Sequence, residues 1–415
     1  MTMLNRIITD RIFCGLDIGA QKIKAGALKV NEQKELELIG LYESPIYGFN
    51  NCSVTNLSDL SECIHANLNG LASKAQIKVK DVQLGIGGDL IKSRGGQAVI
   101  PLVDRGHKVI TSRDIKHVNE QARLLGTKMD EEILHDLPQN YEVDDVNSAL
   151  NPLGLYGRKL AVRSISILAD ANRMRNIVKA VNQAGFDVSR TCFSSYAAAE
   201  VALQEESRQR GCILIDLGAR STNVLIFKDN VLQSYEKVAF GGENLTRAIV
   251  KNLKISPAFA EEIKRSYVVA LESERHQEEE ILVKQENEYK PIRRCAIYEA
   301  IQEELETLLD QITAVVERSN MRDYLTGGVY AIGGGALLSG LMERIESSVN
   351  LPVQLGKVQM LSHKNVQNTA LYAPVIGLAC GAYKNTFGYS VASNDDDHWT
   401  ARIVNRMKEL YQEYF

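Results

Sequence analysis

The chain has 415 residues, of which 45% are hydrophobic and 24% are charged, and only 8 are prolines. At roughly 150 residues per domain this length predicts two to three domains, and the composition excludes a globally disordered chain. The 48 basic and 52 acidic side chains give a net charge of −4, which argues against a dedicated nucleic-acid binder, because such proteins usually carry a basic excess. The 7 cysteines are odd in number and form no C-x-x-C pair, so we expect reduced thiols without a disulfide framework or a zinc site.

The chain contains no apolar run long enough to cross a bilayer as a helix. Its N-terminus, MTMLNRIITDRIF, lacks the apolar core and the small-residue cleavage site of a secretory signal. We therefore expect a cytoplasmic protein, unless its last seventeen residues attach it to a surface.

Two similar segments lie close to half a chain apart, GLDIGAQKIKAGAL at 15–28 and LIDLGARSTNVLIF at 214–227. Each is an apolar strand that ends in Asp-Ile-Gly or Asp-Leu-Gly, followed by a short polar turn and a second apolar strand. A strand–turn–strand unit that occurs twice suggests two related α/β lobes, although two copies can also arise by chance.

Between and after these units the pattern predicts further elements in order. A helix is expected at about 56–75, and a second is expected in TSRDIKHVNEQARLL, where Thr111 and Ser112 supply capping hydroxyls. The segments ILHDLPQNYEV and GRKLAVRSISILA read as strands of an inserted α+β domain. The charged segment 272–290 reads as the solvated edge of a helical subdomain, and 296–318 as a long amphipathic helix.

The predicted organisation has two lobes, an insertion and a tail. The first lobe takes residues 1–82, 163–195 and about 356–390, the inserted domain 83–162, the second lobe 196–239 and 326–355, its helical and β subdomain 240–325, a flexible acidic linker 391–398, and a C-terminal helix 399–415.

The two Asp-x-Gly turns are candidates for phosphate binding. Successive backbone N–H groups in such a turn can surround phosphate oxygens, and an aspartate at the strand end suits a hydrated Mg²⁺ ion, which needs few carboxylates. A third element, Gly333-Gly334-Gly335, follows an apolar strand in GVYAIGGG and is predicted to open a helix in ALLSGLMERIESSV. Each turn alone is more often structural, but the three in this order favour nucleotide binding. The sequence has neither a P-loop nor a Rossmann fingerprint.

The order DIGAQK, an insertion, DLGARSTN, GGENLT, AEEIKRSY and AIGGGALLSGL resembles the actin/Hsp70/sugar-kinase ATPase superfamily. Within it, EEILHDLPQNYEVDD followed by NPLGLYGRKL resembles the inserted domain of the FtsA family of bacterial cell-division proteins. The resemblance covers nearly the whole chain. It implies an actin-like two-lobe ATPase fold with an inserted α+β domain and a C-terminal amphipathic helix.

The resemblance also implies a site for ATP and Mg²⁺. The implied nucleotide-binding residues are Asp17, Gly19, Gln21, Lys22, Asp216, Gly218, Ser221, Thr222, Asn223, Gly241, Gly242, Asn244, Glu261, Lys264, Gly333, Gly334 and Gly335, with Asp17 and Asp216 reaching the metal through water.

The chain departs from the family pattern at several of these positions. Ala219 and Arg220 stand where the family usually has two glycines, so the second loop is stiffer and can crowd a γ-phosphate. Asn223 replaces the usual aspartate near the metal. Ser194 stands where hydrolysing relatives often have a glutamate that orients water, and losing a positioned base commonly costs about 10²–10⁴ in rate. We expect ATP binding with weak or absent hydrolysis.

The tail WTARIVNRMKELYQEYF has the spacing of a helix with one apolar face. The apolar residues are Trp399, Ile403, Val404, Met407, Leu410, Tyr411, Tyr414 and Phe415. Five charges would cost about 15 kcal/mol inside a bilayer, so the helix is predicted to lie in the membrane interface rather than to span it. The alternative is a helix packed on its own domain.

The resemblance implies a peripheral protein on the cytoplasmic side of the inner membrane at the division site. Its implied partners are an FtsZ-like tubulin homologue, further copies of itself in an actin-like filament, the lipid surface, and division proteins of the membrane. Two alternatives stay open: a protein like PilM of type IV pilus assembly, which needs no amphipathic tail, and an active phosphotransferase or ATPase of the same superfamily.

Overall fold

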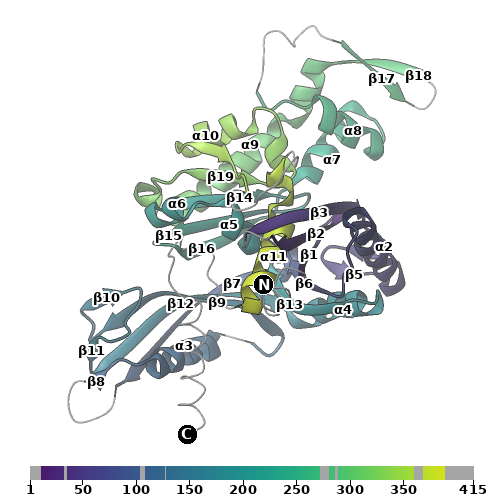
Figure 1. The fold of residues 1–415 in the computed structure, drawn as a ribbon. Coiled ribbons are helices and arrows are strands. Elements are labelled where there is room, and N and C mark those ends of the chain that lie inside the picture. The colour runs from purple at the N-terminus through teal and green to yellow at the C-terminus, as the bar shows by residue number, and fades with distance from the viewer. Residues whose placement is uncertain are drawn as a thin grey trace. The chain divides into compact units, whose positions relative to one another are not determined.

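The computed structural model describes residues 11–31, 35–102, 108–126, 128–271, 280–285, 288–358 and 368–387 (Figure 1). The chain divides into one compact unit, Met1–Ala382, and a second, Tyr383–Phe415. Of the second unit only the end of a helix is described. The predicted linker 391–398 and helix 399–415 lie outside the described residues.

A five-stranded sheet forms the centre of the first lobe, in the order β13-β6-β1-β2-β3. Its first three strands in the chain pair antiparallel, and β6 and β13 continue the sheet in parallel. The bounds are β1 (Ile12–Ile18), β2 (Lys22–Val30), β3 (Leu36–Pro45), β6 (Asp81–Ile86) and β13 (Asp187–Phe193), with a small hairpin of β4 (Phe49–Asn50) and β5 (Ser53–Val54).

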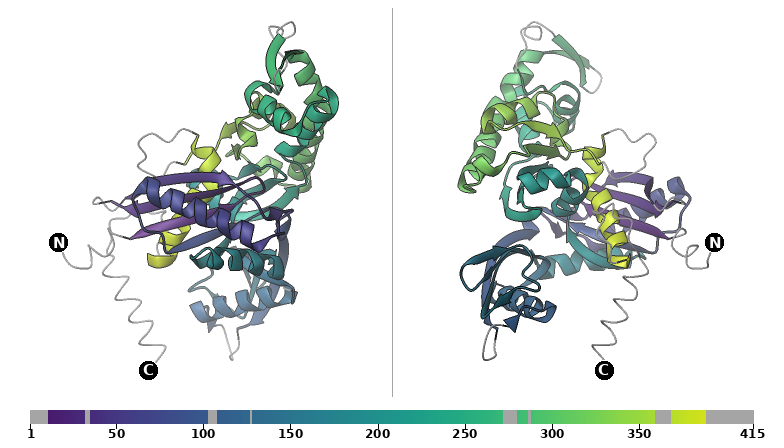
Figure 2. Two further views of the ribbon diagram at one scale, coloured as in Figure 1. Left: turned by 90° about the vertical axis from the view of Figure 1, so that its right-hand side faces the viewer. Right: turned by 60° about the vertical axis from the view of Figure 1, so that its left-hand side comes forward.

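Helices of the first lobe are α2 (Leu57–Ala75), α4 (Ala171–Gln183), α5 (Ser194–Ala202) and α11 (Thr369–Phe387). Helix α2 crosses β2 and β3 on one face of the sheet (Figure 2). It begins where predicted because the Asn56 side chain accepts hydrogen bonds from the N–H groups of Ser58 and Asp59, which satisfies two otherwise free helix donors.

The second lobe repeats this topology in a second five-stranded sheet, in the order β16-β15-β14-β19-β20. Again the first three strands pair antiparallel and the last two join in parallel. The bounds are β14 (Cys212–Leu217), β15 (Thr222–Lys228), β16 (Val231–Val238), β19 (Val329–Ile332) and β20 (Val353–Leu355), with α6 (Glu205–Arg210) before the sheet. The predicted repeat of a strand–turn–strand unit is confirmed, and it extends to the whole sheet.

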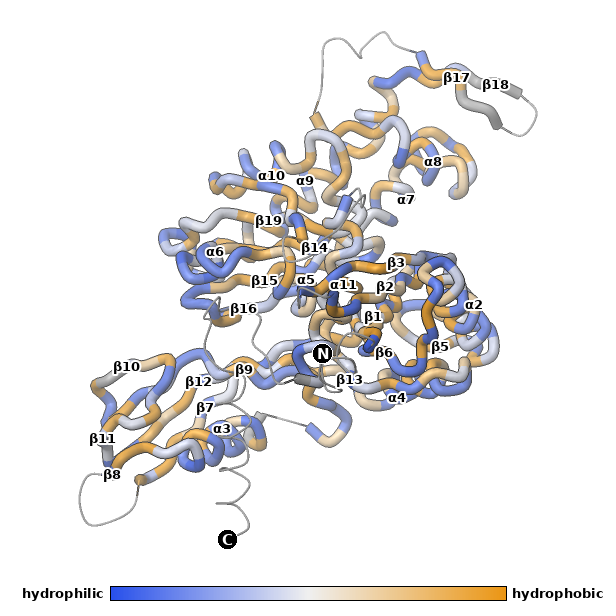
Figure 3. The backbone as a smooth tube through the Cα atoms, in the orientation of Figure 1, coloured by the Kyte–Doolittle hydropathy of each residue, from blue (hydrophilic) through white to orange (hydrophobic). Residues whose placement is uncertain are grey.

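Hydrophobic residues predominate along the central strands of this second sheet (Figure 3). Five of the six residues of β14 are apolar and all six are buried, as all four residues of β19 are. Strands buried on both faces read as continuous apolar runs rather than as an alternating pattern, which is why both strands were visible in the sequence.

The inserted domain is a four-stranded sheet, β10-β9-β12-β7, with helix α3 packed on β7 and β12. The bounds are η1 (Gly88–Leu90), β7 (Ile91–Pro101), β8 (Lys108–Val109), α3 (Ser112–Gly126), β9 (Glu131–Val143), β10 (Asn147–Ala149), β11 (Tyr156–Gly157) and β12 (Lys159–Asp170). The predicted range of this domain was 83–162. In the structure β6, which ends at Ile86, still belongs to the first lobe's sheet, and β12 continues the inserted domain's sheet as far as Asp170. Both boundaries of the inserted domain therefore lie later in the chain than predicted.

The helical subdomain of the second lobe contains α7 (Gly242–Leu253), α8 (Pro257–Tyr267), the hairpin β17 (Glu280–Gln285) and β18 (Glu288–Arg293), and α9 (Arg294–Arg318). The long amphipathic helix expected at 296–318 is confirmed as α9. Part of the charged segment 272–290 forms the hairpin, and residues 272–279 lie outside the described part of the chain.

The glycine triplet does not open an α-helix directly. A 3₁₀ turn, η4 (Gly335–Leu337), follows β19, and α10 (Leu341–Val349) begins only after Gly340, which adopts a left-handed φ of 80°. Another 3₁₀ turn, η3 (Arg322–Tyr324), precedes β19. The prediction of a helix running from Ala336 to Val349 was therefore wrong in its first turn, because the left-handed residue interrupts the α-helical backbone.

Candidate functional site

Two aspartates from the two repeated hairpins are held by consecutive serines of one helix. Ser194 Oγ donates to Asp17 Oδ1 at 2.6 Å, and Ser195 Oγ donates to Asp216 Oδ2 at 2.6 Å. Asp17 lies in β1 and Asp216 in β14, one residue before the C-terminal end of each strand. Because both serines begin α5, the N-terminal turn of that helix brings the carboxyl groups of both lobes to one place.

Ionisation of the two carboxyl groups at this place is unfavourable, because both are removed from water. Burial raises the pKa of Asp17 and of Asp216, the serine hydrogen bonds lower both, and the charge of Asp17 raises the pKa of Asp216 further. Two partly desolvated carboxylates are stabilised by a cation. No group of three or more His, Cys, Asp or Glu side chains able to hold a metal occurs among the described residues. A hydrated Mg²⁺ ion keeps most of its water and needs few protein carboxylates, so the donor chemistry of Asp17 and Asp216 is compatible with such an ion.

Lys24 is the cationic side chain near both aspartates. It faces Asp17 across the β1–β2 pair, and its Nζ donates to the backbone oxygen of Leu371 at 2.8 Å. Burial lowers the pKa of Lys24, and the carboxylates of Asp17, Asp216 and Glu43 act against this shift. Lys24 thus supplies positive charge where the two hairpins meet.

The first predicted loop connects β1 and β2. Gly19 N donates to Lys22 O at 3.0 Å, which closes the turn. Gln21 Nε2 donates to Glu243 Oε1 of the second lobe at 3.3 Å, whereas the Lys22 ammonium forms an ion pair with Glu43 on β3. The predicted residues of the first loop therefore lie in one turn, but the Lys22 side chain extends toward Glu43 of the neighbouring strand and not toward the second lobe.

The second predicted loop is tied to the start of α7. Gly218 N donates to Ser221 O at 3.1 Å within the turn. Gly242 N then donates to Gly218 O at 3.0 Å, and Glu243 N donates to Ala219 O at 2.7 Å. A Cβ on Gly241 would lie 2.5 Å from Ala219 O, so only glycine permits this approach. The turn is held by the first amides of α7.

Two further predicted residues support this junction. Buried Thr222 donates through Oγ1 to Phe240 O at 2.8 Å, just before the two glycines. Asn244 Oδ1 accepts from Gly241 N at 3.2 Å and so caps α7.

Lys264 and Glu261 of α8 lie against the first turn of α7. Lys264 Nζ donates to Glu261 Oε2 at 2.6 Å, to Thr246 Oγ1 at 2.9 Å and to Gly242 O at 3.0 Å. The hydrogen bonds from Lys264 and Thr246 lower the pKa of Glu261 despite its partial burial, so the ion pair is maintained. These two residues fix one helix against the other beside Gly242.

The glycine triplet adjoins the second hairpin. Gly333 has a φ of 86°, and a Cβ there would lie 2.6 Å from Leu217 O and 2.9 Å from Asp216 Oδ1. Its N–H donates to Ala370 O at 3.2 Å. Pro374 has no N–H to bond that carbonyl within α11, so the oxygen can accept a hydrogen bond from outside the helix. By contrast, a Cβ on Gly334 would meet only Leu371 Cδ1, at 3.8 Å.

A cluster of side chains joins the two lobes beside the aspartates; we call Gln21, Asn50, Asn51, Arg220 and Glu243 the lobe-bridging cluster. Arg220 Nε donates to both carboxylate oxygens of Glu243, at 2.9 and 3.0 Å. Its NH1 donates to Asn50 Oδ1 and, at 3.0 Å, to Asn51 Oδ1. The residue expected to stiffen the second loop thus also connects that loop to the first lobe.

Comparison with known proteins identifies the family. A family model described as "Cell division protein FtsA" matches residues 213–377, and one described as "SHS2 domain inserted in FTSA" matches residues 88–168, the range from η1 to β12. The FtsA protein of Pseudomonas aeruginosa is 26% identical over 98% of this chain and 99% of its own length. This chain belongs to the FtsA family.

Other FtsA relatives agree over most of the chain. The Streptococcus pneumoniae protein is 29% identical over 89% of this chain and 80% of its own, and the Escherichia coli protein 24% identical over 84% of each. Among solved structures, a chain from the PilM-PilN type IV pilus biogenesis complex superposes with a TM-score of 0.65 at 17% identity, over 89% of this chain and 98% of that one. MreB5 of Spiroplasma citri bound to ADP gives 0.53 at 11% identity, over 91% and 98%. The actin-like two-lobe fold with an inserted domain is confirmed.

Against the FtsA pattern, the departure at Asn223 has a structural partner. Its side chain is 6% exposed, and Nδ2 donates to Ser195 Oγ at 3.0 Å while Oδ1 accepts from the Tyr235 hydroxyl at 3.1 Å. The expectation that it merely removes a carboxylate near the metal is too simple, because this amide is bonded on both sides in the interior.

Sequence reasoning missed four residues of this candidate site: Lys24, Ser195, Tyr235 and Glu243. Lys24 has a signal, since it takes the place in the first hairpin that Asn223 takes in the second. Ser195 directly follows Ser194, the residue that the sequence analysis singled out. Tyr235 and Glu243 have no local signal, because they come from elements whose placement depends on the tertiary fold.

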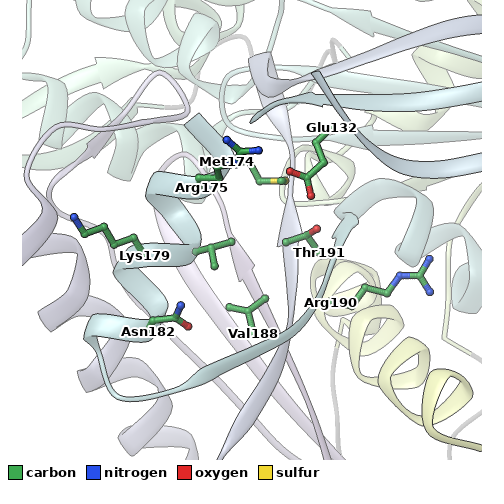
Figure 4. Close-up of a pocket in the computed structure, with 9 residues that line it drawn as sticks. Glu132, Met174, Arg175, Lys179, Asn182, Val188, Arg190 and Thr191 are labelled. Carbon is green, nitrogen blue, oxygen red and sulfur yellow. The ribbon is translucent and has the colours of Figure 1, made fainter. Parts of the chain in front are cut away.

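A separate cavity of about 480 Å³ lies away from the aspartates, between α4, β13 and the start of β9 (Figure 4). Its lining is Glu132, Met174, Arg175, Val178, Lys179, Asn182, Val188, Arg190 and Thr191. None of the predicted nucleotide residues contributes to it.

No helix in the described part of the chain is long and apolar enough to cross a membrane. The eight tail residues predicted to face lipid, Trp399 to Phe415, lie outside the described residues.

Proposed function

We propose that this FtsA-family chain binds ATP with Mg²⁺ between its two hairpin turns and uses the nucleotide as an assembly cofactor with little or no hydrolysis. The observation that carries the proposal is the convergence of Asp17 and Asp216 on Ser194 and Ser195, with Lys24 beside them. Phosphate oxygens next to these groups would neutralise Lys24, and a hydrated Mg²⁺ would neutralise the carboxylates. The MreB5 structures, whose descriptions name ADP and AMPPNP, support a nucleotide in this fold.

The proposed nucleotide contacts follow the predicted residues, with one change. Gly19, Gln21, Gly218 and Ser221 would face phosphates, and Lys24 rather than Lys22 would supply the main cationic contact. Gly241, Gly242, Glu261 and Lys264 would border the ribose and adenine opposite the glycine triplet.

Weak hydrolysis is proposed because the side chain at position 194, which donates to Asp17, ends in a hydroxyl and not in a carboxylate. A water molecule attacking a phosphoryl group must be oriented and deprotonated, and a serine hydroxyl bonded to a carboxylate is a poor base. Ser194 is 6% exposed and already donates to Asp17. Brisk phosphate release by the pure protein would favour the phosphotransferase or ATPase alternative.

The wider role proposed is that of a division adaptor. The protein would assemble into actin-like filaments, bind an FtsZ-like tubulin homologue and division proteins of the membrane, and lie on the cytoplasmic face of the inner membrane through the apolar face of 399–415. Membership of the FtsA family supports this role.

Two measurements test the two halves of the proposal. Mg–ATP should raise the melting temperature of the full-length protein. At a ligand concentration one hundred times Kd, binding adds about 2.7 kcal/mol to the free energy of unfolding. An Asp17→Asn/Asp216→Asn variant should show no such increase. Full-length protein should also float with liposomes, whereas a chain ending at His398 should stay in solution. No gain for the wild type would contradict nucleotide binding, and equal flotation of both chains would contradict the membrane helix.

A further inference from the structure

A directional series of hydrogen bonds ends at Asp216. The Tyr235 hydroxyl donates to Asn223 Oδ1 at 3.1 Å, Asn223 Nδ2 donates to Ser195 Oγ at 3.0 Å, and Ser195 Oγ donates to Asp216 Oδ2 at 2.6 Å. We call these four residues the relay. Their exposed fractions are 5, 6, 1 and 9%, so water has little access to any link.

The chemistry of each side chain fixes the direction of the relay. A carboxylate only accepts hydrogen bonds, so the Ser195 hydroxyl donates its one hydrogen to Asp216. The Ser195 oxygen can then only accept in its bond with the side chain at position 223. The side chain at position 223 must therefore donate to Ser195 and accept from Tyr235. An amide does both, whereas an ionised aspartate cannot donate. Burial, together with the charge of Asp216, raises the pKa of Tyr235, so its hydroxyl keeps the proton that it donates.

The far end of the relay lies on the strand that contacts the inserted domain. Tyr235 belongs to β16, the edge strand of the second sheet. Ser93 Oγ of β7 donates to the backbone oxygen of Tyr235 at 3.1 Å, and Gln139 Nε2 of β9 donates to the oxygens of Leu232 and Gln233 at 3.0 and 2.7 Å. Side chains of the inserted domain thus satisfy the edge of this sheet.

We propose that Asn223 and Tyr235 are positioning residues that orient Asp216 for Mg–nucleotide, and that through them nucleotide occupancy changes the contact between β16 and the inserted domain. The inference rests on the proposed nucleotide site and adds its means of communication. A ligand that draws Asp216 away weakens the Ser195 bond. Ser195, Asn223 and Tyr235 are buried, so their polar atoms cannot readily exchange a lost partner for water, and a buried polar atom without a partner costs about 1–3 kcal/mol. When Asp216 moves, Ser195, Asn223 and Tyr235 must therefore shift with it to keep their hydrogen bonds, and strand β16 moves with Tyr235.

The test uses tyrosine hydroxyl removals in the full-length protein. Tyr235→Phe deletes only the relay hydroxyl. Tyr330→Phe is the matched control, since Tyr330 lies in the same sheet, is 4% exposed, and hydrogen bonds through its hydroxyl to Ser207 at 2.7 Å outside the relay. Asn223→Asp keeps the size of the side chain but loses the donor to Ser195. The readouts are Mg–ATP affinity by calorimetry, and the change in hydrogen exchange of β7 and β9 on adding Mg–ATP.

We expect Tyr235→Phe to lower Mg–ATP affinity about fivefold, as for one hydrogen bond, and to abolish the nucleotide-dependent change in β7 and β9. Asn223→Asp should lower affinity more, and Tyr330→Phe should behave as wild type in both measurements. Equal losses in Tyr235→Phe and Tyr330→Phe, or a wild type whose β7 and β9 do not respond to bound nucleotide, would overturn the inference while leaving the nucleotide site intact. A wild type that binds no Mg–ATP would instead contradict the proposed function itself, and the inference would fall with it.

Discussion

Arg220 and Asn51 join the two lobes, with the guanidinium NH1 of the second lobe donating to the amide oxygen of the first at 3.0 Å. Asn51 adopts a left-handed φ of 46° in the turn between β4 and β5. Arg173 of α4 holds this turn through Ser53 Oγ, at 2.9 Å, and through the backbone oxygen of Asn51. Arg173 therefore fixes the position of the Asn51 side chain, whose amide oxygen accepts from Arg220.

Removing this arginine should loosen the lobes. Arg220→Ala deletes the bonds to Asn50 and Asn51 and leaves Glu243 without its ion pair, so we expect faster hydrogen exchange in residues 49–54. Nucleotide dissociation should quicken severalfold, since a partly exposed pair contributes about 0.2–1 kcal/mol and the amide bonds add to it. Arg318→Ala, which removes a surface ion pair with Glu236, is the control. Slower nucleotide dissociation in Arg220→Ala would mean that the arginine crowds the phosphate instead.

The two lysines of β2 should differ in their effect on nucleotide binding. Lys24→Met keeps a long side chain but removes the ammonium beside Asp17. ATP affinity should therefore fall about tenfold or more, as for the loss of a charge-assisted contact. Lys22→Met removes a surface pair with Glu43 and should lower affinity by less than about threefold. Titration calorimetry distinguishes the two, and a larger effect at Lys22 would restore the assignment made from the sequence.

The glycine triplet offers a substitution that separates folding from binding. Gly334→Asp should fold normally, because its Cβ meets nothing closer than 3.8 Å and its φ is −66°, yet it should abolish ATP-dependent thermal stabilisation by occupying the adenosine side. Gly333→Asp should lower the melting temperature without ligand, since it forces a side chain onto a left-handed backbone against Leu217 O. Undiminished stabilisation of Gly334→Asp by ATP would place the nucleotide elsewhere.

His135 should make stability fall in mild acid. Its Nε2 accepts from Phe193 N at 3.0 Å, and burial, aided by Arg190, lowers the pKa of His135 to about 4 from 6.5. Between pH 6.5 and pH 4 His135 is protonated in the unfolded chain but stays neutral in the folded chain. The contribution of His135 to the free energy of unfolding is therefore fully present above pH 6.5 and is lost as the pH falls toward 4. The loss is at most about 3 kcal/mol.

A glutamine at this position keeps an acceptor for Phe193 N but does not titrate. Denaturant unfolding of His135→Gln between pH 7 and 4 should therefore show a shallower loss of stability than the wild type. His117→Gln, on the exposed side of α3, should keep the wild-type slope. Parallel curves for wild type and His135→Gln would show that other groups cause the acid sensitivity.

The sequence by itself determined the local elements and their repetition. Apolar runs that stop at Asp-x-Gly predicted both hairpins, because a buried strand needs continuous hydrophobicity and its turn needs small residues. The helices at 57–75 and 294–318 were visible because the spacing of their apolar residues is a local property. The inserted domain was recognised by its family motif.

Only the tertiary structure decided which side chains meet. Lys22 and Lys24 stand two residues apart on one face of β2, and their roles differ because Glu43 of β3 pairs with the first while Asp17 and Leu371 surround the second. Asn223 looked like a lost carboxylate until Ser195 and Tyr235, 28 and 12 residues away, proved to bond its two ends. Alternation and helical period fix which neighbours share a face, but a hydrogen bond between distant segments depends on how whole sheets pack, which no short window of sequence contains.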